Sequence, residues 1–355
     1  MSSVITEDAL MVANDWRSAV TPGQIDEPLE FEAFQRTQVW GGDVLSKLLG
    51  KPAADTPIGE SWEVSGLAEH PSRIINGTFA GQLLPDLWSR RSADLTGREH
   101  ASPVFPLFVK WLDCRELLSV QVHPNDVFAR TLGQVSGKSE AWVVVQAEPT
   151  ARIYAGLRTG VTRDELVSRL KAGTVAECLH SFVPKVGDCI ALPAGTIHSA
   201  GGGVVFAEVQ QPSDVTYRLF DWNRVGLDGQ PRPLHIDLAM QALMWPQGPV
   251  SPTIPLPLKC ERGAYGEVLL KSAAFDLERF TVRDSWSQPY SGEMTIWMVL
   301  DGTAVLDGSG YAPHQVLERG STILLPAGVR GAKWAAADTN KPCRLLCVRL
   351  PRHLI

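Results

Sequence analysis

The chain has 355 residues, of which 44% are hydrophobic and 20% charged, so a soluble globular protein with a sizeable core is expected. Its net charge of −6 disfavours nucleic acid and acidic membranes as partners, so an anionic ligand would need a local group of cations. No apolar run long enough for a membrane helix and no signal-peptide segment are present. Six cysteines without a C-x-x-C pair predict reduced core thiols and a cytoplasmic protein.

Few helices are signalled along the chain. They are expected at residues 85–91, 162–172 and 236–244. The second has the clearest signal, because Thr162 and Glu165 have the spacing of a capping box and Gly173 marks a stop. The rest of the chain is dominated by short β-branched or apolar runs bounded by Gly, Pro, Asp or Ser, which favour a β-sandwich or barrel.

Two sequence blocks occur twice, in the same order. GKSEAWVVV at 137–145 parallels GEMTIWMVL at 292–300, and VGDCIALPAGTIH at 186–198 parallels RGSTILLPAGVRG at 319–331. Two copies of one β-barrel are therefore predicted in a mainly β fold. In this alignment Thr295 stands for Glu140 and Gly331 for His198, so only the first copy keeps metal ligands.

The repeat and the composition divide the chain into segments. We expect an N-terminal extension at 1–29, a metal-binding domain at 30–235 with a helical insert at about 160–182, a helix and linker at 236–258, and a C-terminal barrel without metal ligands at 259–355.

A metal site is predicted in the first copy. Gln121 and His123 are spaced i, i+2, so on a strand both side chains point to one face. Glu140 begins the next apolar strand, and His198 follows the P-A-G turn. Two imidazoles, a carboxylate and an amide oxygen suit a divalent ion with an open position, as in catalytic sites. Zn²⁺, Mn²⁺, Fe²⁺ and Co²⁺ all fit such ligands.

The repeated block ending in P-A-G-x-x-H resembles the cupin superfamily, and longer stretches resemble the type I phosphomannose isomerases, in their compact bacterial branch. The matching text includes FVKWLDCRELLSVQVHPND at 108–126, GKSEAWVVV at 137–145, PAGTIHSAG at 194–202 and VTYRLFDWNR at 215–224. The resemblance implies two cupin-type (jelly-roll) barrels with a few short helices. It also implies an enzyme with one Zn²⁺ per chain that interconverts mannose 6-phosphate and fructose 6-phosphate.

The resemblance also assigns roles to single residues. It places the zinc ligands on Gln121, His123, Glu140 and His198. The family's active-site arginine falls on Arg218 and an acidic residue of the same site on Glu208, although an extra glycine in AGGG shifts the latter spacing by one. The positions that face the phosphate or the sugar fall on Ser119, Lys138 and Arg224.

The implied chemistry moves a proton between C1 and C2 through a cis-enediol. A metal acting as a Lewis acid and the cation of Arg218 would stabilise the charge that grows on the carbonyl oxygen. The proton-transfer base stays open among Glu208, Lys138 and a metal-bound water or hydroxide. The phosphate is unreacted, so its binding energy serves to orient the sugar.

Two other functions compete with this interpretation. One is another metal cupin enzyme, such as a dioxygenase or a different sugar isomerase. A dioxygenase would need Fe²⁺ and an O₂ site and would have no use for Lys138 and Arg218 beside the metal. A non-catalytic sugar-phosphate-binding cupin would bind its ligand without exchanging the C2 hydrogen with solvent. The expected partner is a small hexose phosphate, without nucleic acid or membrane, and the expected state is a monomer or homodimer.

Overall fold

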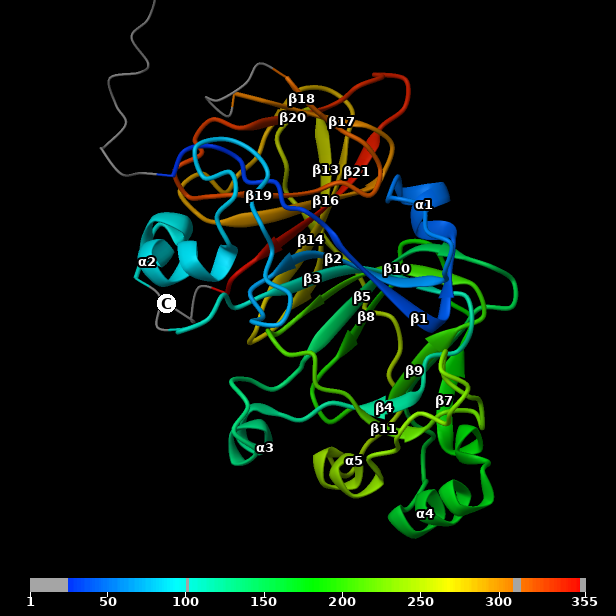
Figure 1. Ribbon diagram of the computed structural model, residues 1–355. Helices are drawn as coiled ribbons and strands as arrows, with labels where there is room; N and C mark the ends of the chain where they lie inside the picture. Colours follow the sequence, from blue (N-terminus) through cyan, green and yellow to red (C-terminus); the bar gives the residue numbers. More distant parts are fainter. Residues whose placement is uncertain (1–24, 100–101, 309–313, 352–355) are drawn as a thin grey trace, which may run out of the picture.

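The computed structural model describes residues 25–99, 102–308 and 314–351. They form two β-barrels, one above the other in Figure 1, with short helices at the periphery. This confirms the predicted mainly β fold with two cupin-type barrels. Within the described residues, no helix has the length and apolarity needed to cross a membrane.

The first barrel consists of two antiparallel sheets, with strand orders β1-β2-β3-β10-β5-β8 and β11-β4-β9-β6-β7. Their bounds are β1 Phe34–Gly42, β2 Ile58–Ser65, β3 Phe108–Cys114, β4 Val120–Val122, β5 Glu140–Ala147, β6 Arg152–Leu157, β7 Leu179–Phe182, β8 Cys189–Leu192, β9 His198–Gly201, β10 Val204–Gln210 and β11 Tyr217–Phe220.

The second barrel repeats this plan with sheets β12-β13-β14-β21-β16-β19 and β15-β20-β17-β18. Its strands are β12 Leu256–Leu258, β13 Ala264–Lys271, β14 Asp276–Val282, β15 Trp286–Ser287, β16 Thr295–Asp301, β17 Ala304–Asp307, β18 Gln315–Leu317, β19 Thr322–Leu325, β20 Lys333–Ala336 and β21 Cys343–Arg349. The repeat seen in the sequence therefore corresponds to one strand order used twice, except that the described residues of the second barrel have no counterpart of β11.

Strand β5 shows how the core fixes the direction of a functional side chain. Ala141, Val143 and Val145 belong to the large core that the two six-stranded sheets share. Trp142 and Val144 belong instead to the core inside the first barrel. Because strand side chains alternate between faces, Glu140 shares the inward face with Trp142 and points into the first barrel.

The helices are α1 Val44–Leu49, α2 Leu84–Thr96, α3 Asp126–Thr131, α4 Arg163–Ala172 and α5 Ile236–Ala242. For α4 the predicted signals are confirmed, because the Thr162 side chain accepts from Glu165 N (3.2 Å) and Gly173 has a φ of 71°. The helix expected at 85–91 is longer, extending to Thr96 across a kink at Arg91.

Two short helices were not expected, α1 and α3. Helix α3 starts directly after Asn125, whose side chain caps it by accepting from Phe128 N at 2.9 Å. Both helices have six residues, too few for a hydrophobic repeat to reveal them.

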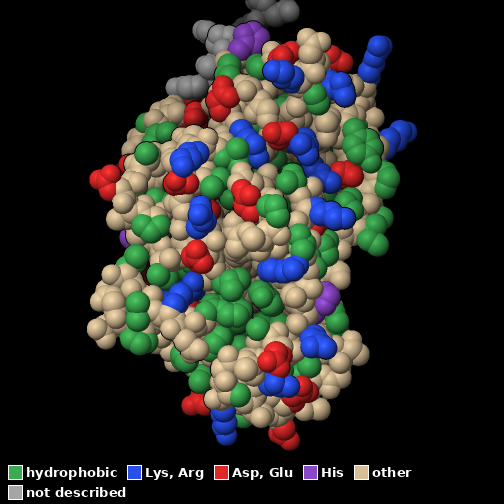
Figure 2. Space-filling model, turned by 90° about the vertical axis from the view of Figure 1, so that its right-hand side faces the viewer, with side chains coloured by type: hydrophobic (Ala, Val, Ile, Leu, Met, Phe, Trp, Pro, Cys, Tyr) green, Lys and Arg blue, Asp and Glu red, His purple; other side chains and the backbone are tan. Residues whose placement is uncertain are grey.

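The expected N-terminal extension lies mostly outside the described residues, and its last part is packed. Ile25 and Leu29 are buried, and Leu29 exchanges backbone hydrogen bonds with Leu324 of the second barrel. On the face shown in Figure 2, cationic and anionic side chains are interspersed, and hydrophobic side chains gather in the lower half. No single sign of charge dominates that face, so attraction of an anion depends on a local cluster.

Candidate metal centre and active site

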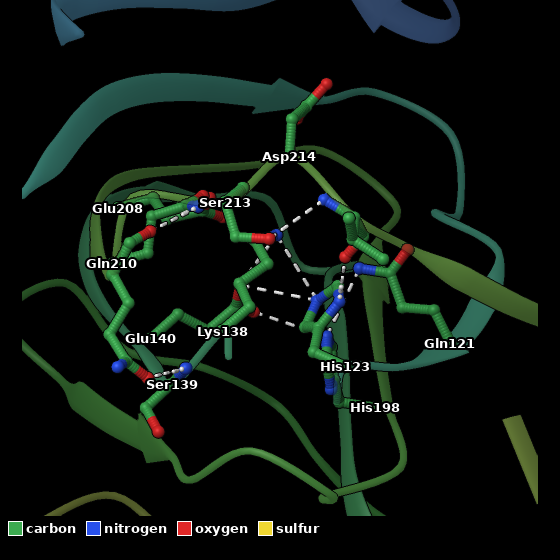
Figure 3. Close-up of polar contacts among 12 residues, drawn as sticks. Gln121, His123, Lys138, Ser139, Glu140, His198, Glu208, Gln210, Ser213 and Asp214 are labelled. Carbon is green, nitrogen blue, oxygen red and sulfur yellow. Dashed lines mark hydrogen bonds and ion pairs between the residues drawn. The ribbon is translucent and has the colours of Figure 1, made fainter. Parts of the chain in front are cut away.

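Three buried side chains converge inside the first barrel, as Figure 3 shows. Ligand atoms of His123, Glu140 and His198 all lie within 4.8 Å of one another. His198 Nε2 is 3.2 Å from Glu140 Oε1, and His123 Nε2 is 3.4 Å from Glu140 Oε2. The sequence prediction had grouped these residues, and the structure brings them together.

The hydrogen bonds of the two histidines decide which ring nitrogen carries the proton. His123 Nδ1 lies 2.8 Å from the carbonyl oxygen of Val215, and His198 Nδ1 lies 2.8 Å from that of Thr196. A carbonyl only accepts, so each Nδ1 donates and each Nε2 keeps its lone pair. Both imidazoles therefore direct a lone pair toward Glu140.

Glu140 is the centre of this acceptor-rich cluster. Both of its oxygens are buried, and the charged group that faces them is Lys138, whose Nζ is 3.0 Å from Oε2. Burial works to raise the pKa of Glu140, but the charge of Lys138 and the adjacent histidines hold that pKa well below its ordinary value. An ionised carboxylate facing two imidazole lone pairs fits a divalent cation.

His123 is prepared for the same role. Its burial, followed by the positive charge of Lys138, lowers the pKa of His123 well below its ordinary value. The imidazole therefore stays neutral at physiological pH, which is the form that binds a metal.

Gln121 and Lys138 complete the inner site. Gln121 lies opposite His198 in the pairing of β4 with β9, and its amide nitrogen is 3.1 Å from His198 Nε2. Lys138 Nζ is 3.0 Å from Glu140 Oε2 and 3.3 Å from His123 Nε2. An ammonium group thus already lies against the acceptors, and the Gln121 amide would have to turn for its oxygen to face an ion.

Two glycines allow these segments to approach. A Cβ on Gly137 would lie 2.6 Å from the backbone carbon of Asn125, so only glycine lets the residue before Lys138 pack there. Gly195 of the P-A-G turn has a φ of 86°, and its N–H donates to the His123 carbonyl at 2.8 Å. That bond ties the turn preceding His198 to the strand that ends at His123.

Glu208 lies on the neighbouring strand, opposite Lys110 and Trp142 in the sheet register. Its Oε2 accepts from the Trp142 indole at 3.0 Å, and its Oε1 is 3.7 Å from Lys110 Nζ. Burial, together with the negative charge of Glu140, raises the pKa of Glu208 to about 7. A buried carboxyl that titrates near neutrality can exchange protons at physiological pH.

The sequence reasoning missed the carboxylates around Lys110. Lys110 is buried and pairs with Glu60 (3.1 Å) and Asp214 (3.4 Å). Asp214 also accepts from Arg36 at 2.7 Å. Burial alone would lower the pKa of Lys110, but these carboxylates outweigh it and raise the pKa. The signal available in the sequence was the lysine inside the apolar run VFPLFVKWL, which required buried counter-charges.

The remaining predicted residues lie along β4 and β11. Ser119 is buried, and its hydroxyl donates to Gln121 Oε1 at 3.3 Å. Arg218 pairs with Gln121 in the register of the two strands, which places it on the same face of the sheet. Arg224 is not free, because it donates to Asp221 at 2.8 Å and 3.1 Å.

Comparison with known proteins shows which family the chain is similar to. The family model described as the phosphomannose isomerase type I catalytic domain matches residues 29–165. The chain is 30% identical over 304 residues to a mannose-6-phosphate isomerase from Streptococcus mutans, covering 86% of this chain and 94% of that protein.

Two proteins from Bacillus subtilis are similar as well. The mannose-6-phosphate isomerase ManA is 30% identical over 305 residues, with 85% of this chain and 94% of ManA covered. The crystal structure of a mannose 6-phosphate isomerase from this organism superimposes with a TM-score of 0.83 at 26% identity, over 91% of this chain and 100% of the other.

Proposed function

The chain belongs to the type I phosphomannose isomerase family, and from this premise we propose that it interconverts mannose 6-phosphate and fructose 6-phosphate through a cis-enediol with one Zn²⁺ per chain. The observation that carries the proposal is the His123–Glu140–His198 cluster. Its acceptors converge beside a carboxyl, Glu208, whose pKa is raised to about 7.

The ion would be held by His123, Glu140 and His198, with Gln121 as a neutral fourth ligand. Bound there, Zn²⁺ would supply Lewis acidity that polarises the sugar carbonyl. Nitrogen and oxygen ligands without a thiolate suit this ion, and fewer protein ligands than its coordination shell accepts would leave room for the sugar.

Glu208 is our choice for the proton carrier among the candidates that the sequence left open. As a carboxylate it would take the proton from C2 of the open-chain aldose and return it to C1 of the enediol, while the hydroxyl proton moves from O2 to O1. Its pKa of about 7 allows both directions near neutral pH.

Lys138 is better suited to donate hydrogen bonds than to accept a proton. Its amino group is paired with Glu140 at 3.0 Å, and an ammonium group has no lone pair. We therefore assign Lys138 and Arg218 to stabilising negative charge on the substrate oxygens. Ser119, which precedes β4, and Arg224, which follows the turn after β11, would hold the phosphate.

A coupled assay for conversion of mannose 6-phosphate to fructose 6-phosphate tests the proposal, run with and without a chelator and after return of Zn²⁺. We expect turnover that the chelator abolishes and Zn²⁺ restores. Activity that survives complete metal removal would contradict the metal role. Incubation of the sugar phosphate with the enzyme in D₂O should introduce deuterium at C2 of mannose 6-phosphate, whereas a non-catalytic binding protein would leave this position unlabelled.

Family membership also bears on the ligand, the location and the oligomeric state that we expect for the enzyme. A hexose phosphate is the expected small-molecule partner, and the cytoplasmic location and the monomeric or dimeric state stay predictions. The expected boundaries of the two barrel domains stay predictions too.

A further inference from the structure

The chain makes a tight turn directly after β11, and this turn is fixed next to Ser119. Trp222 and Asn223 have φ values of 56° and 55°, a region that residues other than glycine seldom adopt. The Trp222 indole donates to the Leu118 carbonyl at 2.6 Å, which pins the turn beside the start of β4. Asparagine adopts this region readily, but tryptophan does not, so the strained Trp222 marks the turn as a candidate functional segment.

The chain then returns to the same place through a short hairpin. Val225 forms a bridge with Pro231, and Gly226 N donates to the Gln230 carbonyl at 2.7 Å. Arg232 follows between Pro231 and Pro233, whose rings restrict the backbone on both sides of it. The returning segment therefore presents Arg232 from a restricted backbone.

Asp221 joins the two ends of this loop. Its buried carboxylate accepts from Arg232 Nε at 2.7 Å and Nη2 at 2.5 Å, and from Arg224 Nε at 3.1 Å and Nη2 at 2.8 Å. A guanidinium has five N–H donors, so both arginines retain donors after these bonds. Neither Nη1 donates to any described residue of the chain.

Arg218 adds a third guanidinium to the group. Its Nη1 donates to the Pro233 carbonyl at 2.8 Å, and its buried Nε has no partner among the described residues. Burial and then the positive charge of Arg232 lower the pKa of Arg218. A one-to-one salt bridge would balance its charges, whereas here Arg224 and Arg232 share the single carboxylate of Asp221.

The position of this group relative to the metal centre matters. In the pairing of β11 with β4, Arg218 lies opposite Gln121 and Phe220 opposite Val120. Asp221 follows Phe220 and Ser119 precedes Val120, so both lie at the same end of the strand pair. Asp221 and the two arginines bound to it therefore lie at the Ser119 end of the strand pair, whereas Arg218 lies opposite Gln121.

We propose that Arg232 is a phosphate-binding residue of this enzyme, acting with Arg224, and that Asp221 is the positioning residue that holds both guanidinium groups for the phosphate. This inference rests on the proposed function for the identity of the ligand. Arg224 and Arg232 carry one positive charge more than Asp221 balances, and guanidinium edges suit the oxygens of a phosphate.

The test uses the metal-loaded enzyme and two readouts, the KM for mannose 6-phosphate and the Ki of inorganic phosphate as a competitive inhibitor. For Arg232→Ala we expect both to rise at least about tenfold, as for a lost charged hydrogen bond. Arg232→Lys keeps the charge but loses the paired N–H donors of the guanidinium, so its KM and Ki should lie between those of wild type and Arg232→Ala. Arg169→Ala is the matched control, because Arg169 lies on α4, outside the site, and pairs there with Glu177.

Asp221→Asn separates positioning from mere loop closure. It keeps all three arginines and removes the charge that orients two of them, so Ki for phosphate should rise while metal content stays at one ion per chain. If Arg232→Ala and Arg232→Lys both fold and leave KM and Ki within twofold of wild type, Arg232 only closes the loop and the proposal is wrong.

Calorimetric titration with inorganic phosphate distinguishes the failure of this inference from the failure of the proposed function. Phosphate binding that is weakened in Arg232→Ala, in a protein that does not isomerise mannose 6-phosphate, would support the anion site and remove the isomerase assignment. Isomerase activity with phosphate binding independent of Arg232 would do the opposite.

Discussion

Glu140 and Thr295 occupy the same position in the two barrels. Glu140 begins β5 and lies opposite Leu192 of β8, while Thr295 begins β16 and lies opposite Leu325 of β19. These are the residues that the sequence repeat aligns. Thr295 is buried and its hydroxyl accepts from the Trp297 indole at 2.8 Å. The second barrel therefore shows how the same sheet position is filled when no carboxylate is needed.

This equivalence predicts the outcome of Glu140→Thr. We expect the variant to fold, because Thr295 shows that the sheet accommodates threonine at this position, and to lose its metal and its activity. Metal analysis of the purified protein and circular dichroism measure the two effects. The matched exchange Thr295→Glu should not create a second site, since Gly331 offers no ligand where the first barrel has His198. Stoichiometric metal in Glu140→Thr would contradict the single-site view.

The turn before His198 gives a prediction about preorganisation. A Cβ on Gly195 would lie 2.2 Å from Met244 Cγ, in addition to the strain of a φ of 86°. Gly160 has a similar φ of 88° but open space around its Cβ position. Both alanine variants should lose about 1–2 kcal/mol of stability from backbone strain. Only Gly195→Ala should also weaken zinc binding, measured by competition with a chromogenic chelator. Equal zinc affinity in the two variants would show that the turn does not position His198.

The sequence was informative where chemistry follows the period of a strand. Gln121 and His123 share a face because they are two residues apart, and the repeat located Glu140 and His198. The ion pairs that complete the site have no such period. Lys110 and Asp214 are 104 residues apart, so their contact depends on the tertiary fold.

The ion pairs of Arg224 could not be predicted from the sequence either. The motif indicated a cation near the sugar phosphate, but not that Asp221 would hold it or that Arg232, 11 residues beyond that aspartate, would share the carboxylate. Side-chain pairs across a loop follow from the path of the loop. That path includes positive φ values at Trp222 and Asn223; asparagine is a common residue in such turns, but tryptophan does not ordinarily signal one.

Arg218→Ala tests the stabilisation of charge on the substrate. The variant should fold and keep one metal ion, since Arg218 contacts Pro233 and His235 rather than the ligand set. Its kcat should fall by about 10²–10³, the effect expected when a preorganised donor to a developing oxyanion is removed. Steady-state kinetics with metal analysis of the same sample decide this. A kcat near that of wild type would remove Arg218 from its proposed role.

The raised pKa of Glu208 predicts a pH dependence of stability in the metal-free protein. Glu208 holds its proton up to about pH 7 in the folded state, against an ordinary value of 4.5. Between these limits the folded state binds more protons than the unfolded chain, so the free energy of unfolding falls as pH rises. The decline attributable to this group is up to about 3 kcal/mol. In Glu208→Gln it should be absent, whereas the opposing effect of His123 is common to both proteins and cancels in the comparison.

The same carboxyl should govern the acid limb of the activity. If Glu208 carries the proton, its ionised form is required, so kcat/KM should rise as the pH rises through its pKa. Glu208→Gln should remove this acid limb and lower the rate by a factor of about 10²–10⁴. The charge of a bound ion favours the carboxylate, and the limb of the zinc enzyme should therefore lie below the pKa of about 7 of the metal-free protein. A Glu208→Gln enzyme with an unchanged acid limb would assign that limb, and the proton transfer, to another group.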